Sequence, residues 1–180
     1  HCFTGTLENH ISSTEEEFPY ERTIHEPFIN ISLDIRNKKH LSNALDSYTK
    51  SYTLDDDNKY YCEQYDRKIR VKKQQLLKEL PRNLVFVLNR FEYDSSMHQR
   101  KKLNDYLEFP FELNMQRWMV RRDGELEGGS AKNLDYVLTG VLVHSGVAES
   151  GHYYTYIKDG ERWLEFNDTA VTQRDVSMVS

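Results

Sequence analysis

The sequence predicts an α+β domain with a largely antiparallel sheet. Several segments alternate apolar and polar residues or are rich in β-branched and aromatic side chains, one segment has helical periodicity, and a strong hairpin signal lies near the C-terminal end. The chain has 180 residues, of which 38% are hydrophobic and 12% aromatic. It is therefore long enough for one domain with its own core, and it lacks the aromatic-poor composition of disordered chains.

The first strand is expected at residues 28–35, because residues 2–27 show no regular pattern. Within this strand the alternation places four aliphatic side chains on one face, which we expect to be buried: Ile29, Ile31, Leu33 and Ile35. A helix follows, with Ser42 as a plausible N-cap. Its apolar face would carry Leu41, Leu45, Tyr48 and Tyr52.

Three further segments have strand-like content. Residues 68–80 are ambiguous, since their composition favours a helix whereas Ile69 and Val71 favour a strand, and Pro81 ends the segment in either case. Residues 83–93 and 135–145 carry apolar residues on both faces, which is typical of strands inside a sheet. The polar stretch between these two strands is expected to be rich in loops.

Composition excludes several classes of function. Twenty-four basic and 29 acidic residues give a net charge of −5, which disfavours nucleic acids and anionic membranes as partners and suits a basic partner better. The longest apolar run, residues 84–88, is too short to span a membrane. Two cysteines, Cys2 and Cys62, are too few for a disulfide framework, so we expect reduced thiols and a cytoplasmic or nuclear location. Because the chain starts at His1, we expect it to be an excerpt of a longer protein.

The hairpin signal lies in "SGHYYTYIKDGERWLEFND", residues 150–168. A type I′ turn at Asp159-Gly160 would pair Lys158 with Glu161 and, further out, His152 with Asn167. Directly opposed Cβ atoms lie about 4.5 to 5.5 Å apart, so the turn predicts a contact between the imidazole and the carboxamide. The other face of this hairpin is apolar and is expected to rest on the core: Tyr153, Ile157, Leu164 and Phe166.

The pair of His152 and Asn167 has two interpretations. Asn167 could fix the tautomer and orientation of His152, which would leave the other ring nitrogen free to act as a base toward a nucleophile. Alternatively, the two side chains only satisfy each other at the edge of a sheet. The residues of the hairpin alone leave both interpretations open.

Several stretches in combination resemble the ubiquitin-specific protease family of papain-like cysteine deubiquitinases. "LVHSGVAESGHYYTYIK" and "RWLEFNDTAV" are similar to the histidine box of that family, and "LPRNLVFVLNRFEYD" followed by "KLNDYLEFPFELNM" is similar to the stretch upstream of it. The residues of these motifs are most similar to those of the fat-facets-type members. The resemblance implies a papain-like fold with a mostly antiparallel palm and fingers, the fingers and adjoining elements in about residues 1–83 and the palm in about 84–180.

The resemblance also implies roles for individual residues. His152 matches the catalytic histidine, Asn167 the residue that orients it, and Asp168 the adjacent polar residue that supports the site. Phe91 and Tyr153 match positions that line the channel for the C-terminal tail of ubiquitin. Two loops, residues 104–113 and 145–150, match those that border this channel; Gly146 and Gly151 would let the backbone pass close to a narrow tail. The implied activity is hydrolysis of the isopeptide or peptide bond after the last glycine of ubiquitin, with ubiquitin and ubiquitinated proteins as partners.

The sequence departs from this family at two places. The nucleophilic cysteine of the family lies upstream in a Gly-Asn-Thr-Cys setting at a helix N-terminus, and neither Cys2 nor Cys62 has that context. The thumb that carries the nucleophile is therefore expected outside this chain, as a partner from the same parent protein. Many members hold zinc with two Cys-x-x-Cys pairs. In this sequence Cys62 is the one cysteine of the second pair, because Tyr65 stands where its mate would be, and His10 and His25 are no convincing substitutes. We therefore expect neither zinc nor any other cofactor.

Three hypotheses follow from the sequence. The first is a part of an active, thiol-dependent deubiquitinase. The second is a catalytically inactive ubiquitin-binding domain or scaffold that has kept the fold, and the third is an unrelated β-rich structural domain. The presence of His152, Asn167 and Asp168 favours the enzyme, because an inactive relative is free to lose them.

Overall fold

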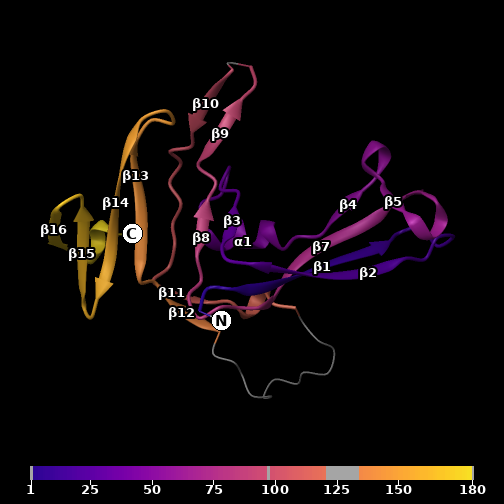
Figure 1. Cartoon of the computed structure of the whole chain (residues 1–180), viewed down its shortest axis with the longest axis horizontal. Coiled ribbons are helices and arrows are strands. Elements are labelled where there is room, and N and C mark those ends of the chain that lie inside the picture. Colours follow the sequence, from indigo (N-terminus) through magenta and orange to yellow (C-terminus); the bar gives the residue numbers. More distant parts are fainter. Residues whose placement is uncertain (1, 97, 121–133, 180) are drawn as a thin grey trace. The chain divides into compact units, whose positions relative to one another are not determined.

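The computed structural model describes residues 2–96, 98–120 and 134–179. The chain forms two compact units, each built from three segments: residues 1–33, 45–87 and 115–134 make the first, and residues 34–44, 88–114 and 135–180 the second. Each unit contains a four-stranded antiparallel sheet (Figure 1), which agrees with the largely antiparallel fold class that the sequence predicts. Within the described ranges, no helix combines the length and the apolar character needed to cross a bilayer.

The sheet of the first unit has the order β2-β1-β7-β4. Its strands are β1 (Gly5–Ser13), β2 (Glu21–Phe28), β7 (Val71–Glu79) and β4 (Tyr52–Leu54). The prediction that residues 2–27 are irregular is wrong. The inward-facing positions of β1 include the polar Asn9, and β2 is a mostly exposed edge strand, so neither gives a clean alternation of apolar residues. The ambiguous residues 68–80 are strand rather than helix, because β7 pairs with both β1 and β4.

Shorter elements complete the first unit. The strand β3 (Ile31–Leu33) pairs with β8 (Phe86–Leu88), and β5 (Tyr60–Cys62) pairs with β6 (Arg67–Ile69). Three short 3-10 helices lie at Asp56–Asn58, Glu63–Tyr65 and Gln116–Trp118. The indole N–H of Trp118 donates to Asp46 Oδ1 over 2.8 Å and ties the last of these 3-10 helices to the α-helix at Leu41–Tyr48.

The expected strand at residues 28–35 is shorter than predicted. Ile31, Leu33 and Ile35 are buried as expected, but Ile29 lies in a bend and is exposed. The helix α1 spans Leu41–Tyr48. It starts one residue before Ser42, which therefore is not its N-cap; the backbone N–H of Leu41 donates to the Glu108 carbonyl instead. Tyr52 is not part of the helix, because it pairs with Lys73 of β7.

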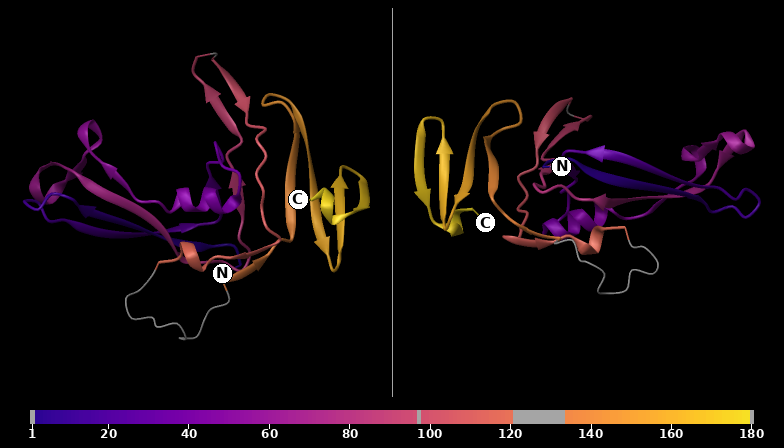
Figure 2. Two further views of the ribbon diagram at one scale, coloured as in Figure 1. Left: turned by 180° about the vertical axis from the view of Figure 1, so that it is seen from behind. Right: turned by 60° about the horizontal axis from the view of Figure 1, so that its bottom comes forward.

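The sheet of the second unit has the order β13-β14-β15-β16. It consists of β13 (Gly140–Gly146), β14 (Gly151–Asp159), β15 (Arg162–Asn167) and β16 (Ala170–Arg174), which lie side by side in both views of Figure 2. Two antiparallel strand pairs belong to the same unit: the hairpin of β9 (Phe91–Asp94) with β10 (Gln99–Lys102), and β11 (Glu112–Asn114) paired with β12 (Asp135–Val137). A 3-10 helix at Val176–Met178 ends the described chain.

The two long inner strands expected from the sequence are each interrupted. Residues 83–93 contain β8 and β9, separated at Asn89 and Arg90, and residues 135–145 contain β12 and most of β13. The prediction that both faces of the first segment are covered is wrong for Val85 and Val87, which are exposed. The reason is that, among the residues that the structure describes, β8 pairs with β3 alone and does not lie inside a larger sheet.

One face of the β13–β16 sheet carries the core of the second unit. Tyr156, Trp163 and Val179 are buried together, and Phe111 packs edge-to-face on Trp163 at a centroid distance of 6.0 Å. Because Tyr156 pairs with Glu165 and side chains alternate along a strand, His152 and Asn167 belong to this same face. The predicted catalytic pair therefore lies on the same face of the sheet as the core residues Tyr156 and Trp163.

Candidate active site

The predicted contact between His152 and Asn167 is present. His152 lies one residue into β14 and Asn167 is the last residue of β15, and His152 Nε2 is 2.6 Å from Asn167 Oδ1. Because a carboxamide oxygen only accepts, Nε2 carries the hydrogen and donates it. Nδ1 is then the basic nitrogen of the neutral ring, on an imidazole whose side chain is 47% exposed.

The register that brings these two residues together differs from the prediction. Asp159 pairs with Arg162, so the two turn residues are Gly160 and Glu161 rather than Asp159 and Gly160. Only Gly160 of the two has a positive φ, of 60°, which fits a turn with glycine at its first central position. The predicted pair of Lys158 and Glu161 is therefore wrong, and an ion pair of 2.7 Å between Asp159 and Arg162 takes its place at the turn.

This shift makes His152 and Asn167 diagonal rather than directly opposite neighbours. The outermost paired residues of this hairpin are Thr155 and Phe166. Continued outward, the same register would place residue 169, two residues after Asn167, opposite His152. Diagonal neighbours on one face remain within reach of long or ring side chains. The contact survives the change of register because the shift of two residues keeps both side chains on the same face.

Asp168 closes the site at the turn into β16. It adopts a left-handed backbone with φ 52°, which aspartate tolerates better than most residues, and Asn167 pairs with Ala170 across this turn. Its carboxylate Oδ2 lies 3.9 Å from His152 Nε2, and its side chain is 78% exposed. Asp168 therefore lies beside the imidazole as a solvated negative charge, whereas the direct hydrogen bond to His152 is made by Asn167.

The apolar face of the hairpin is not on the core as predicted. Tyr153, Ile157 and Phe166 are 56%, 40% and 40% exposed. Neighbouring strands add Leu142 and Val171, which are also exposed, to the same face. The prediction fails because the buried aromatic pair Tyr156 and Trp163 lies on the opposite face, where the described part of the unit provides its packing partners.

A pocket of about 550 Å³ lies beside the site, between the β9–β10 hairpin and the end of β13 and β14. It brings together the predicted Phe91, Tyr153 and Gly151 with residues that the prediction missed, among them Glu92, Arg100 and His144. The ring of His144 lies 4.7 Å from that of Tyr153 and 5.2 Å from that of Phe91. Strand pairing could have revealed His144, since it is directly opposite Tyr153 in the ladder.

The two predicted glycines, Gly146 and Gly151, are each required by the backbone geometry, but for different reasons. Gly146 has a φ of +116°, which favours glycine. Gly151 is required by a close approach: a Cβ atom there would lie 2.1 Å from His144 Nε2 and 2.5 Å from the Ser145 carbonyl oxygen. The imidazole of His144 thus rests directly on the backbone of the residue before His152.

Lys102 holds the start of the loop at residues 145–150. Its Nζ donates to the carbonyl oxygen of His144 over 2.7 Å and to that of Gly146 over 3.1 Å. The other predicted loop, residues 104–113, is anchored through Arg90, whose guanidinium donates to the carbonyl oxygens of Leu103 and Asp105. Basic side chains therefore fix the backbone of both loops that the resemblance placed along a channel.

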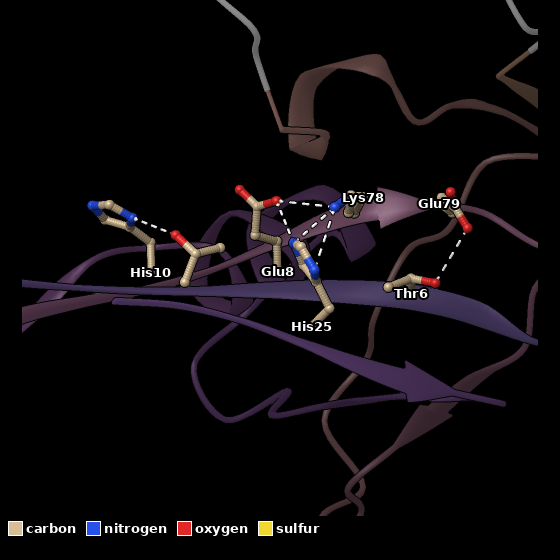
Figure 3. Close-up of polar contacts among 7 residues, drawn as sticks. Thr6, Glu8, His10, His25, Lys78 and Glu79 are labelled. Carbon is tan, nitrogen blue, oxygen red and sulfur yellow. Dashed lines mark hydrogen bonds and ion pairs between the residues drawn. The ribbon is translucent and has the colours of Figure 1, made fainter. Parts of the chain in front are cut away.

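The residues considered for a zinc site do not suit a metal. Cys62 is fully buried among Ile11, Ile69 and Val71. The Tyr65 hydroxyl donates to the Pro19 carbonyl, and His25 contacts Glu8 and Lys78 at 2.9 and 2.7 Å (Figure 3). His10 contacts Thr23. In the ranges that the structure describes, no three His, Cys, Asp or Glu side chains lie close enough together to hold a metal ion.

Comparisons with known proteins agree with this architecture. The chain is 33% identical to one in the solved structure of the SAGA Ubp8/Sgf11/Sus1/Sgf73 DUB module bound to ubiquitin aldehyde, with a TM-score of 0.85, covering 99% of this chain and 39% of that one. It is 38% identical to ubiquitin carboxyl-terminal hydrolase 9Y of Mus musculus over 180 residues, and 36% identical to the probable ubiquitin carboxyl-terminal hydrolase FAF of Drosophila melanogaster over 174. These alignments cover 86% and 88% of this chain but only 7% and 6% of the relatives.

The fold is thus that of a papain-like deubiquitinase catalytic domain. The family model described as "Ubiquitin carboxyl-terminal hydrolase" matches residues 1–180, and the chain belongs to that family. The resemblance to the fat-facets-type members is confirmed by the similarity to FAF and to hydrolase 9Y.

Proposed function

We propose that this chain supplies the general base and its orienting residue to a thiol-dependent deubiquitinase. The observation that carries the proposal is the hydrogen bond of 2.6 Å between His152 and Asn167; the chain neighbours of His152, Gly151 and Tyr153, line the pocket that contains Phe91. The nucleophilic thiol comes from a part of the protein outside these 180 residues. Cys62 is unsuited to that role because it is buried in a hydrophobic core.

The geometry supports a two-step reaction. His152 Nδ1 takes the proton of the cysteine thiol, and the thiolate attacks the carbonyl carbon of the last glycine of ubiquitin. The carbon–nitrogen bond breaks, the leaving amine receives the proton from His152, and a thioester remains. Water then loses a proton to His152 as it attacks the thioester; the carbon–sulfur bond breaks, and the departing thiolate regains its proton from His152. Ubiquitin leaves with a C-terminal carboxylic acid, which releases its proton to the solvent.

Asn167 and Asp168 serve the imidazole in different ways. The fixed Nε2–H tautomer presents Nδ1 as the base throughout the reaction. When His152 becomes an imidazolium, the Asn167 oxygen accepts a stronger hydrogen bond, and the charge of Asp168 at 3.9 Å favours the same cation. Asp168 is well solvated, so its contribution is smaller than that of Asn167.

The substrate is a ubiquitinated protein whose ubiquitin tail enters between the two anchored loops. Phe91 and Tyr153 offer aromatic surface to this tail, and Gly146 and Gly151 keep side chains out of its path. The complex of a similar chain with ubiquitin aldehyde supports this assignment. Reduced cysteines and this substrate suit a cytoplasmic or nuclear location.

The partner of the exposed apolar face is the remainder of the same catalytic domain. Leu142, Ile157, Phe166 and Val171 are exposed apolar side chains on one face of four paired strands. Such a surface marks a site of contact. The chain spans 39% of the similar solved chain, so a longer domain has additional chain that can cover this face and, on the opposite face of the sheet, can bring the thiol to His152.

The alternative is an inactive ubiquitin-binding scaffold. Hydrolysis of a fluorogenic ubiquitin C-terminal amide by the full-length protein separates the two functions. We expect His152→Ala and Asn167→Ala to lower kcat by about 100-fold or more, as for other base and orienting residues. His40→Ala is a matched control, because His40 is an exposed histidine of the same unit paired with Glu108. Full binding of ubiquitin without hydrolysis by the unmodified protein would support the scaffold.

A further inference from the structure

The orientation of the Asn167 amide decides whether His152 is held in the useful tautomer. With Oδ1 toward His152, the amide accepts the Nε2–H; with the group turned over, Nδ2 would present two hydrogens to the same ring nitrogen. The two orientations have nearly the same shape, so packing alone does not select one. A polar partner on the other side of the amide is needed to select it.

Glu165 occupies the position from which such a partner would act. It lies two residues before Asn167 on β15, so both side chains point to the same face of the sheet. Glu165 is only 8% exposed, which is unusual for a carboxylate. An ionised carboxylate accepts hydrogen bonds and donates none.

Arg174 of β16 keeps the Glu165 carboxylate ionised and in place. Arg174 Nε lies 2.9 Å from Glu165 Oε2, and its terminal nitrogen Nη2 lies 3.3 Å from Oε1, so both oxygens are engaged. Hydrogen bonding from Arg174 lowers the pKa of the Glu165 carboxyl against the opposing effect of burial, with smaller contributions from the side chains of Tyr156 and Asn167. The only hydrogens that the Asn167 side chain can offer to this carboxylate are those on Nδ2.

We propose that Glu165, fixed by Arg174, is a positioning residue that accepts a hydrogen bond from Asn167 Nδ2 and so turns Asn167 Oδ1 toward His152. The line Arg174, Glu165, Asn167 and His152 runs along the covered face of the sheet from β16 to β14. Glu165 contacts neither the substrate nor the reacting atoms, and acts through Asn167. This inference rests on the proposed function for its kinetic consequence, but its effect on the His152 ring does not.

The test replaces the ion pair between the buried Glu165 and the partly exposed Arg174 in the full-length protein. The double variant Glu165→Leu/Arg174→Leu removes both charges together and leaves no unpaired partner, so the fold is retained. The single variant Glu165→Gln keeps the size of the side chain and one accepting oxygen, and it serves where the double variant fails to fold. The double variant Asp159→Asn/Arg162→Gln is the matched control, because it removes an exposed ion pair from the other end of the same hairpin.

Two measurements are made on each variant. In the hydrolysis of a fluorogenic ubiquitin amide, we expect the double leucine variant to lose about tenfold in kcat with KM within about twofold, since the lost orientation concerns the reacting state and not binding. Glu165→Gln should recover part of that loss, and the control should match the unmodified protein. In nitrogen NMR of labelled histidine, the ring signals of His152 should move from the Nε2–H tautomer toward a mixture of both.

The two measurements separate the possible failures. A folded Glu165 variant with unchanged kcat and an unchanged His152 tautomer overturns the positioning role and leaves a purely structural ion pair. If the unmodified protein is inactive, the proposed function fails, while the tautomer measurement still decides the role of Glu165. An equal loss of kcat in the Asp159/Arg162 control would also overturn the proposal.

Discussion

Replacement of Gly151 by alanine tests how tightly the backbone beside His152 is packed. The added Cβ atom would lie 2.1 Å from His144 Nε2, 2.6 Å from His144 Cε1 and 2.5 Å from the Ser145 carbonyl oxygen. Real Cβ contacts are essentially never shorter than 3.0 Å, so the ring must retreat by roughly 1 Å and the carbonyl by about half that distance.

Neither group can retreat freely. The His144 ring is in contact with the rings of Phe91 and Tyr153, and Ser145 pairs with His152 in the strand ladder. Overpacking of this kind costs about 1 to 3 kcal/mol of unfolding free energy. Because the strain is relieved through the pairing of Ser145 with His152, we also expect a lower kcat.

Denaturant unfolding and ubiquitin amide hydrolysis of the full-length protein measure the two effects. Gly140→Ala is the control, since its Cβ atom would lie 3.2 Å from the flexible end of Ile157 and at an ordinary contact distance of 3.5 Å from the Tyr156 carbonyl oxygen. Adding His144→Ala to Gly151→Ala should recover part of the stability by removing the ring contact but not the carbonyl contact. Equal stability and equal kcat for the Gly151→Ala and Gly140→Ala variants would refute the account of Gly151.

Three other predictions concern the core, the pH dependence and the loop. Trp163→Ala should lower the unfolding free energy by about 3 to 5 kcal/mol in denaturant titrations, as for other buried tryptophans, and a loss below 1 kcal/mol would contradict its place in the core. Burial raises the pKa of Tyr156 from 10.0 to about 12, so the folded protein keeps a proton that the unfolded chain loses. The resulting stability is complete below pH 10 and disappears as the pH rises toward 12; the melting temperature of Tyr156→Phe should lack this component over that window. Lys102→Met should free two loop carbonyls and raise KM for the ubiquitin substrate several-fold, with Lys102→Arg closer to the unmodified protein; an unchanged KM would argue that the loop holds its shape without the lysine.

The sequence was informative where the pattern is local. The hairpin of β14 and β15, the contact between His152 and Asn167, and the antiparallel class follow from alternation and turn chemistry. The register does not, because Asp159-Gly160 and Gly160-Glu161 both offer a glycine for a positive φ. Only the packing of Tyr156 and Trp163 on one face shows which face of the sheet carries the core.

The rest depended on contacts between distant segments. The edge strand β2 carries little apolar signal, so its pairing with β1 is visible only in three dimensions. The sequence assigned no role to Glu165, whose burial becomes understandable only with Arg174 bound to it from β16. His144 was not identified from the sequence either, although Tyr153, the residue opposite His144 in the strand ladder, was identified.

The central claim is that His152 serves a thiol that lies outside these 180 residues. The most direct measurement treats the full-length protein with ubiquitin that carries an electrophile at its C-terminus and maps the adduct by mass spectrometry. The account predicts one covalent adduct, on a cysteine other than Cys2 and Cys62, which is lost or greatly slowed in His152→Ala and retained in His40→Ala. Binding of the probe without an adduct, an adduct on Cys2 or Cys62, or labelling of His152→Ala at the unmodified rate would contradict it.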